Sequence, residues 1–232
     1  MEKKKTIASI GSMCQTKWKV CLMLKSHEYV HSPFDNVVNM TLYQFENILD
    51  LMQSNYTQLT TDTLKYHERI GSRIVDEQNA LYKGYDYTGN ELSKPFNLTH
   101  FFDTPNKDEF LENEQAWDRF NHKIDVFDHA IRDNDSVLTL VSIRRIDDDD
   151  NPFHRNYLIR SANRLMHYIQ SLRTENFIII NLIEANVDTE IIEEQSEHLV
   201  SIVVPSKELK GTMYWQRPEK SRFLELTAQY AI

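Results

Sequence analysis

Glycine, proline and cysteine are scarce in this chain of 232 residues, which holds five glycines, six prolines and two cysteines. So few cysteines exclude a disulfide-stapled scaffold and a cysteine-rich zinc site, because both need several thiols in fixed pairs. Cys14 and Cys21 are seven residues apart, so on a helix they would lie roughly 10 Å apart, beyond disulfide reach. Two free thiols favour a reducing compartment, and we expect a cytoplasmic protein.

Long apolar runs and an excess of basic residues are missing as well. The longest apolar run, FIIINLIEA at 177–185, has the length of a strand, whereas a membrane helix needs about 18 consecutive apolar residues. The apolar run after the basic N-terminus is too short for a secretory signal. The 26 basic residues are outnumbered by 35 acidic ones, which gives a net charge of −9 and disfavours nucleic-acid binding. We therefore expect no membrane span and no nucleic-acid partner.

Apolar runs of strand length alternate with helical patterns along the chain. Strands are predicted at 6–10, 136–144, 177–184 and 197–205, and helices at 14–25, 41–53, 106–133, 157–173 and, as a helix or an edge segment, 220–230. Residues 147–156 are predicted as a charged loop, and residues 54–95 suggest only short strands and turns. Buried strands separated by long helices are typical of a mainly parallel sheet covered on both faces. We predict a single α/β domain over residues 1–232, with a three-layer, Rossmann-like arrangement.

The junction between the first strand and the first helix, SIGSMC at 9–14, holds a glycine and a cysteine. Ligands of such sheets bind outside the carboxyl ends of the strands. Gly11 permits a sharp turn, Ser12 can cap the helix, and Cys14 would lie in its first turn. There the helix dipole and free N–H groups stabilise a thiolate, and the same groups suit an oxyanion. Cys14 is thus a candidate nucleophile if a histidine lies near. A buried packing role for Cys14 stays open, and for Cys21 it is our interpretation.

Residues 10–35, IGSMCQTKWKVCLMLKSHEYVHSPFD, resemble the opening of a bacterial domain family of papain-like cysteine peptidases. That opening is a strand, a Gly-Ser-x-Cys turn, a helix with basic residues and a Ser/Thr-Pro-Phe-Asp segment, usually followed by Trp. The matching residues are Gly11, Ser12, Cys14 and 32–35, and Asn36 stands where Trp is commoner. Three later segments are similar to further elements of the family: THFFD, AWDRFNHKID and LTLVSIRR, which provide His100, Arg119 and Arg144.

The resemblance implies a thiol-dependent hydrolase or acyl transferase that acts on a peptide or another small acyl or glycan substrate. Cys14 would be the nucleophile, and His100 would take its proton and return it to the leaving group. Asp35 would orient the imidazole, with Asp103 as its rival and helix capping as its plain structural role. Ser12 and Arg144 are candidates for substrate binding. We expect no cofactor and no metal.

Several alternatives stay open at this point. His27 or His31, which flank the predicted first helix, could replace His100 as the base. Arg144 and Arg145 end a core strand and suit a carboxylate or phosphate, but a structural ion pair with the adjacent acids at 147–150 is the favoured interpretation. His122 and His129 are seven residues apart, wider than the spacing of a helical zinc pair, and indicate a solvated face. The runner-up function is a sugar- or nucleotide-handling α/β protein with an anion site at the first turn, and a third possibility is an interaction module without catalysis.

Overall fold

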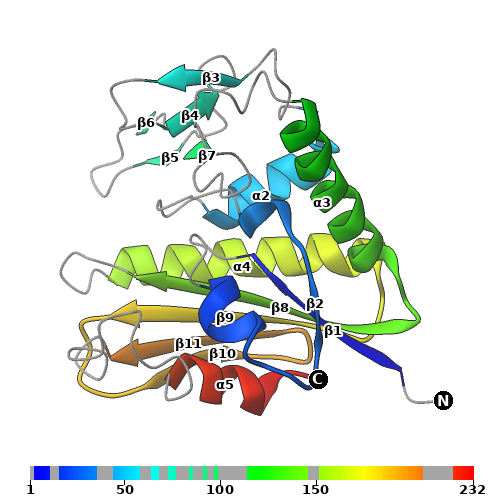
Figure 1. Ribbon diagram of the computed structural model, residues 1–232. Helices are drawn as coiled ribbons and strands as arrows, with labels where there is room; N and C mark the ends of the chain where they lie inside the picture. Colours follow the sequence, from blue (N-terminus) through cyan, green and yellow to red (C-terminus); the bar gives the residue numbers. More distant parts are fainter. Residues whose placement is uncertain are drawn as a thin grey trace.

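The computed structural model describes residues 3–10, 16–35, 44–57, 64–67, 73–76, 84–85, 91–92, 97–98, 114–145, 152–205 and 222–232. Its centre is a six-stranded sheet with the strand order β10-β11-β9-β8-β1-β2 (Figure 1). The four predicted strands are all present, as β1 (Lys4–Ser9), β8 (Ser136–Arg145), β9 (Phe177–Ala185) and β11 (Leu199–Pro205). They run parallel to one another, so the prediction of a mainly parallel α/β sheet is confirmed.

Two strands at the edges of this sheet were not expected from the sequence. β2 (Glu28–Val30) pairs parallel to β1, and β10 (Ile191–Gln195) pairs antiparallel to β11. β2 has three residues between two histidines, too few for a recognisable apolar run. β10 has a register shift between Ile192 and Glu194. Short, charged and irregular edge strands discourage edge-to-edge association with other chains.

The predicted helices are present with altered bounds, as α2 (Gln44–Gln53), α3 (Glu114–Arg132), α4 (Pro152–Leu172) and α5 (Arg222–Tyr230). The prediction of a loop over 147–156 is wrong from Pro152 onward, because α4 begins there. Proline suits the first turn of a helix, where its missing N–H has no partner to lose. Within the helix predicted at 14–25, the described residues form a five-residue π-helix, η1 (Lys17–Cys21), which is followed by turns.

Each face of the main sheet packs on its own apolar core. Along β9, Phe177, Ile179 and Ile183 belong to the core shared with α2, α3 and α4, whereas Ile178, Ile180 and Leu182 belong to the core shared with η1 and α5. The alternation follows from the two-residue period of a strand. All nine residues of β9 are buried, which explains why the sequence shows a continuous apolar run rather than an alternating one. In Figure 1, α4 and α2 lie over one face and α5 lies against the other.

Between α2 and α3 the chain forms short antiparallel strands. β3 (Leu64–His67), β4 (Arg73–Asp76) and β7 (Asn97–Leu98) make a three-stranded sheet, and β5 (Gly84–Tyr85) pairs with β6 (Glu91–Leu92). The short strands predicted within 54–95 are confirmed, and the turns predicted between them lie outside the described residues. The single-domain organisation stays a prediction, because the segments that connect these strands lie outside the described residues.

Arg173 joins three elements at the amino edge of the sheet. Its side chain is fully buried and donates hydrogen bonds to the backbone carbonyls of Ala130 at 2.8 Å, Glu175 at 3.2 Å and Ser136. Ala130 is in the last turn of α3, Ser136 begins β8, and Arg173 directly follows α4. A guanidinium at the ends of two helices meets the negative poles of both dipoles. Burial lowers the pKa of Arg173, and the charge of Asp133 opposes this effect.

None of the helices in the described part of the chain is long and apolar enough to cross a membrane.

Candidate functional site

The order of the parallel strands reverses between β1 and β8. From β1 the chain adds β2 on one side, and then β8, β9 and β11 in succession on the other side. Ser9 pairs with Val141 in the register, and the Ile10 amide donates to the Val141 carbonyl at 2.8 Å. β8 continues for four residues beyond this pairing, to Arg145, so the two strands end at the same edge of the sheet. In open parallel sheets the ligand crevice lies at such a reversal point, which makes this edge the candidate functional site.

Three of the segments singled out from the sequence leave the sheet at this edge. The segment with Ser12 and Cys14 comes after β1 in the chain, and both residues lie outside the described residues. Arg144 is the penultimate residue of β8 and is 6% exposed. Asp35 ends η2 (Pro33–Asp35), five residues after the end of β2; its backbone is described, but its side chain is not. His100 and its neighbour Asp103 lie outside the described residues, so the structure does not place the predicted base.

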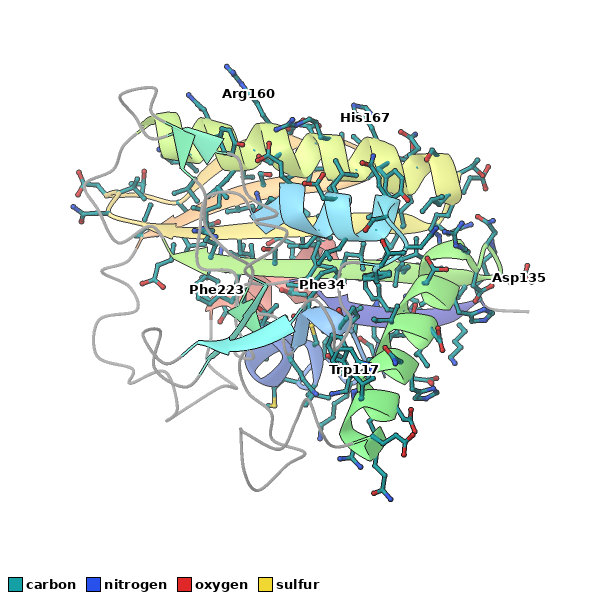
Figure 2. All side chains as sticks on the ribbon, turned by 90° about the horizontal axis from the view of Figure 1, so that it is seen from above. Phe34, Trp117, Asp135, Arg160, His167 and Phe223 are labelled. Atoms are coloured by element: carbon teal, nitrogen blue, oxygen red, sulfur yellow. The ribbon has the colours of Figure 1, made fainter. Side chains whose placement is uncertain are left out.

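The Ser-Pro-Phe part of the motif at 32–35 has a structural role of its own. The Ser32 hydroxyl is buried and accepts a hydrogen bond from the Phe34 amide at 3.1 Å, which closes the short helical turn. Phe34 is 2% exposed and meets the Phe127 ring edge-on, with 5.5 Å between ring centroids. The Tyr56 ring lies 6.5 Å from it on another side. Figure 2 shows Phe34 inside the molecule, whereas Arg160 and His167 point outward from α4. Phe34 thus anchors the backbone at the point where Asp35 follows.

A row of buried polar side chains crosses the sheet next to Arg144. Ser142 of β8, Asn181 of β9 and Ser201 of β11 are adjacent in the register, and all three are fully buried. The Asn181 amide donates to the Ser201 hydroxyl at 3.2 Å. Its carbonyl oxygen is buried and receives no hydrogen bond from the described part of the chain. Arg144, two residues beyond Ser142, lies on the same face of the sheet. Buried polar side chains therefore lie in the part of the sheet that is next to its carboxyl edge.

Thr16 is a site residue that the sequence did not single out. It occupies the N-cap position of η1, two residues after Cys14, but its side chain makes no capping hydrogen bond. The hydroxyl is fully buried and has no hydrogen-bond partner among the described residues. Buried hydroxyls are normally paired, so a buried hydroxyl without a partner among the described residues, two positions after Cys14 in the chain, is a candidate donor. Thr16 was missed because it falls within the helical pattern of 14–25, where a single threonine gives no sign of a functional role.

The expected stabilisation of a Cys14 thiolate by a helix dipole stays a prediction, because residues 11–15 lie outside the described residues. The interpretation of Cys21 is confirmed: its side chain is 1% exposed and belongs to the core under η1 and α5.

The two alternative bases differ in their positions. His27 precedes β2 at the amino edge of the sheet, and its ring nitrogens hydrogen bond with the Ser26 hydroxyl at 3.0 Å and the Ile232 carbonyl at 2.9 Å. Cys14 lies outside the described residues, so His27 also stays an alternative base. His31 directly follows β2 at the carboxyl edge and stacks edge-on against Tyr29 at 5.2 Å. His31 stays an alternative to His100.

Among the described residues, no group of three or more His, Cys, Asp or Glu side chains is arranged to hold a metal ion. Comparison with known proteins adds no assignment: no family model, curated protein or solved structure matches the chain.

Proposed function

We propose that this protein is a thiol-dependent hydrolase or acyl transferase, related to papain-like cysteine peptidases, that acts on a peptide or another small acyl or glycan substrate. The observation that supports it best is that β1, β2 and β8 end at the same edge of the sheet, where the strand order reverses. Three of the resembling segments, Gly11–Cys14, Ser32–Asp35 and the one that ends in Arg144, follow or end these three strands in the chain. We further propose that the fold is a three-layer, Rossmann-like one, with this edge as its crevice.

In this proposal Cys14 and His100 form the reacting pair. His100 takes the thiol proton, and the thiolate attacks the carbonyl carbon while the carbonyl π electrons move to the oxygen. The tetrahedral intermediate collapses, the bond to the leaving group breaks, and the imidazolium protonates the departing atom. Water, or an acceptor nucleophile in a transferase, then attacks the resulting thioester and releases the acyl group. Asp35 orients the imidazole, and a thiol of this kind suits the reducing cytoplasm.

Substrate recognition in the same proposal falls to Ser12 and Arg144. Arg144 ends a core strand at the crevice and presents a guanidinium suited to a carboxylate or phosphate of the substrate. Burial makes such a contact stronger than it would be in water. The buried Thr16 hydroxyl, next to the turn, is a further donor for the substrate or for the sulfur. Neither Ser12 nor Arg144 takes part in the covalent step.

Alkylation of the two thiols tests the proposal. With iodoacetamide at pH 7, Cys14 is expected to react about tenfold faster than an ordinary free cysteine, because an imidazole-paired thiol is largely ionised while its nucleophilicity falls only moderately. Cys21, buried in the core, is expected to stay unmodified until the protein unfolds. Mass spectrometry of the modified peptides measures both rates over a pH series. A Cys21→Ala variant isolates the Cys14 signal as the control.

Two outcomes would contradict this function. A Cys14 rate that follows an ordinary thiol pKa near 8.5 would remove the nucleophile. An unchanged rate in a His100→Ala variant would remove the base and direct attention to His31.

The runner-up function is a sugar- or nucleotide-handling protein, which is favoured by the buried Arg144 at the crevice. It predicts that a nucleotide or phosphosugar raises the melting temperature and that Cys14→Ser leaves this shift unchanged. Arg144→Met would abolish the shift.

A further inference from the structure

A cleft of about 800 Å³ lies beside α3 and β2, the last strand of the main sheet on that side. One end of the cleft is lined by Lys4 and Ser136, which pair with each other at the amino ends of β1 and β8. The other end is lined by Val30, the last residue of β2, and by His31. The cleft therefore runs along the strands and reaches the edge of the sheet where the proposed site lies.

The wall formed by α3 shows that the cleft is elongated. The lining residues on this wall recur at every third or fourth position, at Arg119, His122, Val126, His129 and Asp133, which is the spacing of one face of a helix. The Asp133 amide donates to the His129 carbonyl at 2.9 Å, so the helical hydrogen bonding continues to this residue. From Arg119 to Asp133 the helix rises by roughly 21 Å. An extended chain rises by about 3.3–3.6 Å per residue, so about six of its residues match this length.

The lining of the cleft is apolar in part and has charges of both signs. Val30 and Ala130 are buried and Val126 is half-buried, so they provide apolar contacts. The charged lining residues are Lys4, Lys17, Arg119 and Lys123 together with Glu28, Asp118 and Asp133.

This mixture of groups suits a peptide chain better than a polyanion. Each peptide residue other than proline has one N–H donor and one carbonyl acceptor, whereas a polyanion would be repelled by the three carboxylates. Such contacts do not require unpaired charges. Lys4 and Glu28 form an ion pair at 2.8 Å, yet an ammonium has three donors and a carboxylate has two acceptor oxygens, so paired groups can also bind a peptide.

We propose that this cleft holds an extended peptide segment of about six residues, and that the segment continues past His31 to the bond that is cleaved. This inference rests on the proposed function, because it extends the substrate site from the carboxyl edge along β2 and α3. Ser12 and Arg144 would recognise groups near the reacting carbonyl, whereas the cleft would bind residues further along the chain. Contacts with such remote residues favour long substrates over short ones.

Peptide retention by a Cys14→Ala variant tests the cleft separately from the chemistry. The full-length variant is mixed with a peptic digest of casein, unbound peptides are removed by ultrafiltration, and bound peptides are identified by mass spectrometry. We expect the retained peptides to have about five or more residues, because dipeptides and tripeptides would fill only part of the cleft. Calorimetry then gives the dissociation constant of one retained peptide.

Tryptophan substitutions that fill the cleft test where the peptide binds. Val126→Trp, made in the Cys14→Ala protein, is expected to raise the dissociation constant at least about tenfold, because the indole occupies the middle of the α3 wall. His122→Trp changes an exposed lining residue and repeats the test if Val126→Trp has a lowered melting temperature. Arg160→Trp is the matched control. Arg160 is exposed and points outward from α4 (Figure 2), so this variant is expected to stay within about twofold of its parent.

The outcomes distinguish this inference from the proposed function. Absence of retained peptides, or an unchanged dissociation constant in both cleft variants, would overturn the peptide cleft even if Cys14 is alkylated rapidly in the wild type. Equal retention of dipeptides and longer peptides would overturn the extended binding mode, and retention of chitohexaose without any peptide would overturn the assignment to peptides. Weakened binding in the cleft variants together with an ordinary Cys14 alkylation rate would support the cleft and contradict the thiol chemistry.

Discussion

Replacing Phe34 by alanine is expected to lower the free energy of unfolding by about 3–5 kcal/mol, the usual range for a fully buried phenylalanine. The ring is 2% exposed and packs against Phe127 and Tyr56. Its removal leaves a cavity between η2 and α3 that the surrounding backbone fills only in part. Domains of this kind are stable by about 5–15 kcal/mol, so the variant would fold with a much smaller margin. Urea denaturation followed by far-UV circular dichroism measures the loss.

Two matched variants test whether the loss of stability comes from the lost packing of the Phe34 ring. Phe34→Leu keeps most of the volume and is expected to cost about 1 kcal/mol. Tyr56→Phe keeps the ring and removes a buried hydroxyl that has no hydrogen-bond partner among the described residues; burial raises the pKa of Tyr56 for the same reason, its separation from water. This variant is expected to be as stable as the wild type or more stable. A loss below about 1 kcal/mol for Phe34→Ala would mean that the ring is not part of the core.

The second large effect is expected from Arg173→Met, with a loss of about 2–4 kcal/mol. The substitution leaves the carbonyls of Ala130, Ser136 and Glu175 without their donor. Each buried carbonyl left unpaired costs about 1–3 kcal/mol, and the recovered desolvation of the guanidinium offsets part of the total. The cost of the unpaired carbonyls is the larger of the two, because the buried carbonyls of Ala130 and Ser136 both depend on this one side chain.

Two further variants separate the hydrogen bonds of Arg173 from its charge. Arg173→Lys keeps the charge but has no planar fork with which to reach three carbonyls, so we expect most of the loss to persist. Arg132→Met is the matched control: Arg132 is an exposed residue that pairs with Asp128 at 2.7 Å, and such pairs contribute at most about 1 kcal/mol. Equal stability of the Arg173→Met and Arg132→Met proteins would show that the buried contacts of Arg173 add nothing net.

The main sheet could be predicted because its strands are continuous apolar runs. A strand such as β9, buried on both faces, needs a β-branched or apolar residue at almost every position. β2 and β10 were missed for the opposite reason: an edge strand of three to five residues has one neighbour, and its polar residues look like a loop. The start of α4 was missed because a run of acids and a proline indicated a loop, although proline is favoured at the first helical position.

The candidate site was predictable in position more than in detail. The rule that ligands bind beyond the carboxyl ends of parallel strands pointed to the turn after β1, and the strand order now adds the ends of β2 and β8. Arg144 was identified as the end of a core strand. Thr16 was missed, and so was Asn181, although it is the one amide in the run FIIINLIE and could have been noticed. Whether these side chains have hydrogen-bond partners depends on how distant segments of the chain are placed, which the local sequence does not specify.

The place of β1 in the sheet also constrains the order of folding. β1 is made first, yet its central neighbour is β8, and the Thr6 hydroxyl donates to the Val137 carbonyl across 131 residues of chain. Such distant contacts form late, because a long loop has to close before they contribute. During synthesis the segment with Cys14 would therefore emerge long before β8 is available to pair with β1, and under the proposed function the thiol would become reactive only after β8 docks. Pulse-labelled hydrogen exchange during refolding is expected to protect β1 amides no earlier than those of β8 and β9, and early protection of β1 would contradict this order.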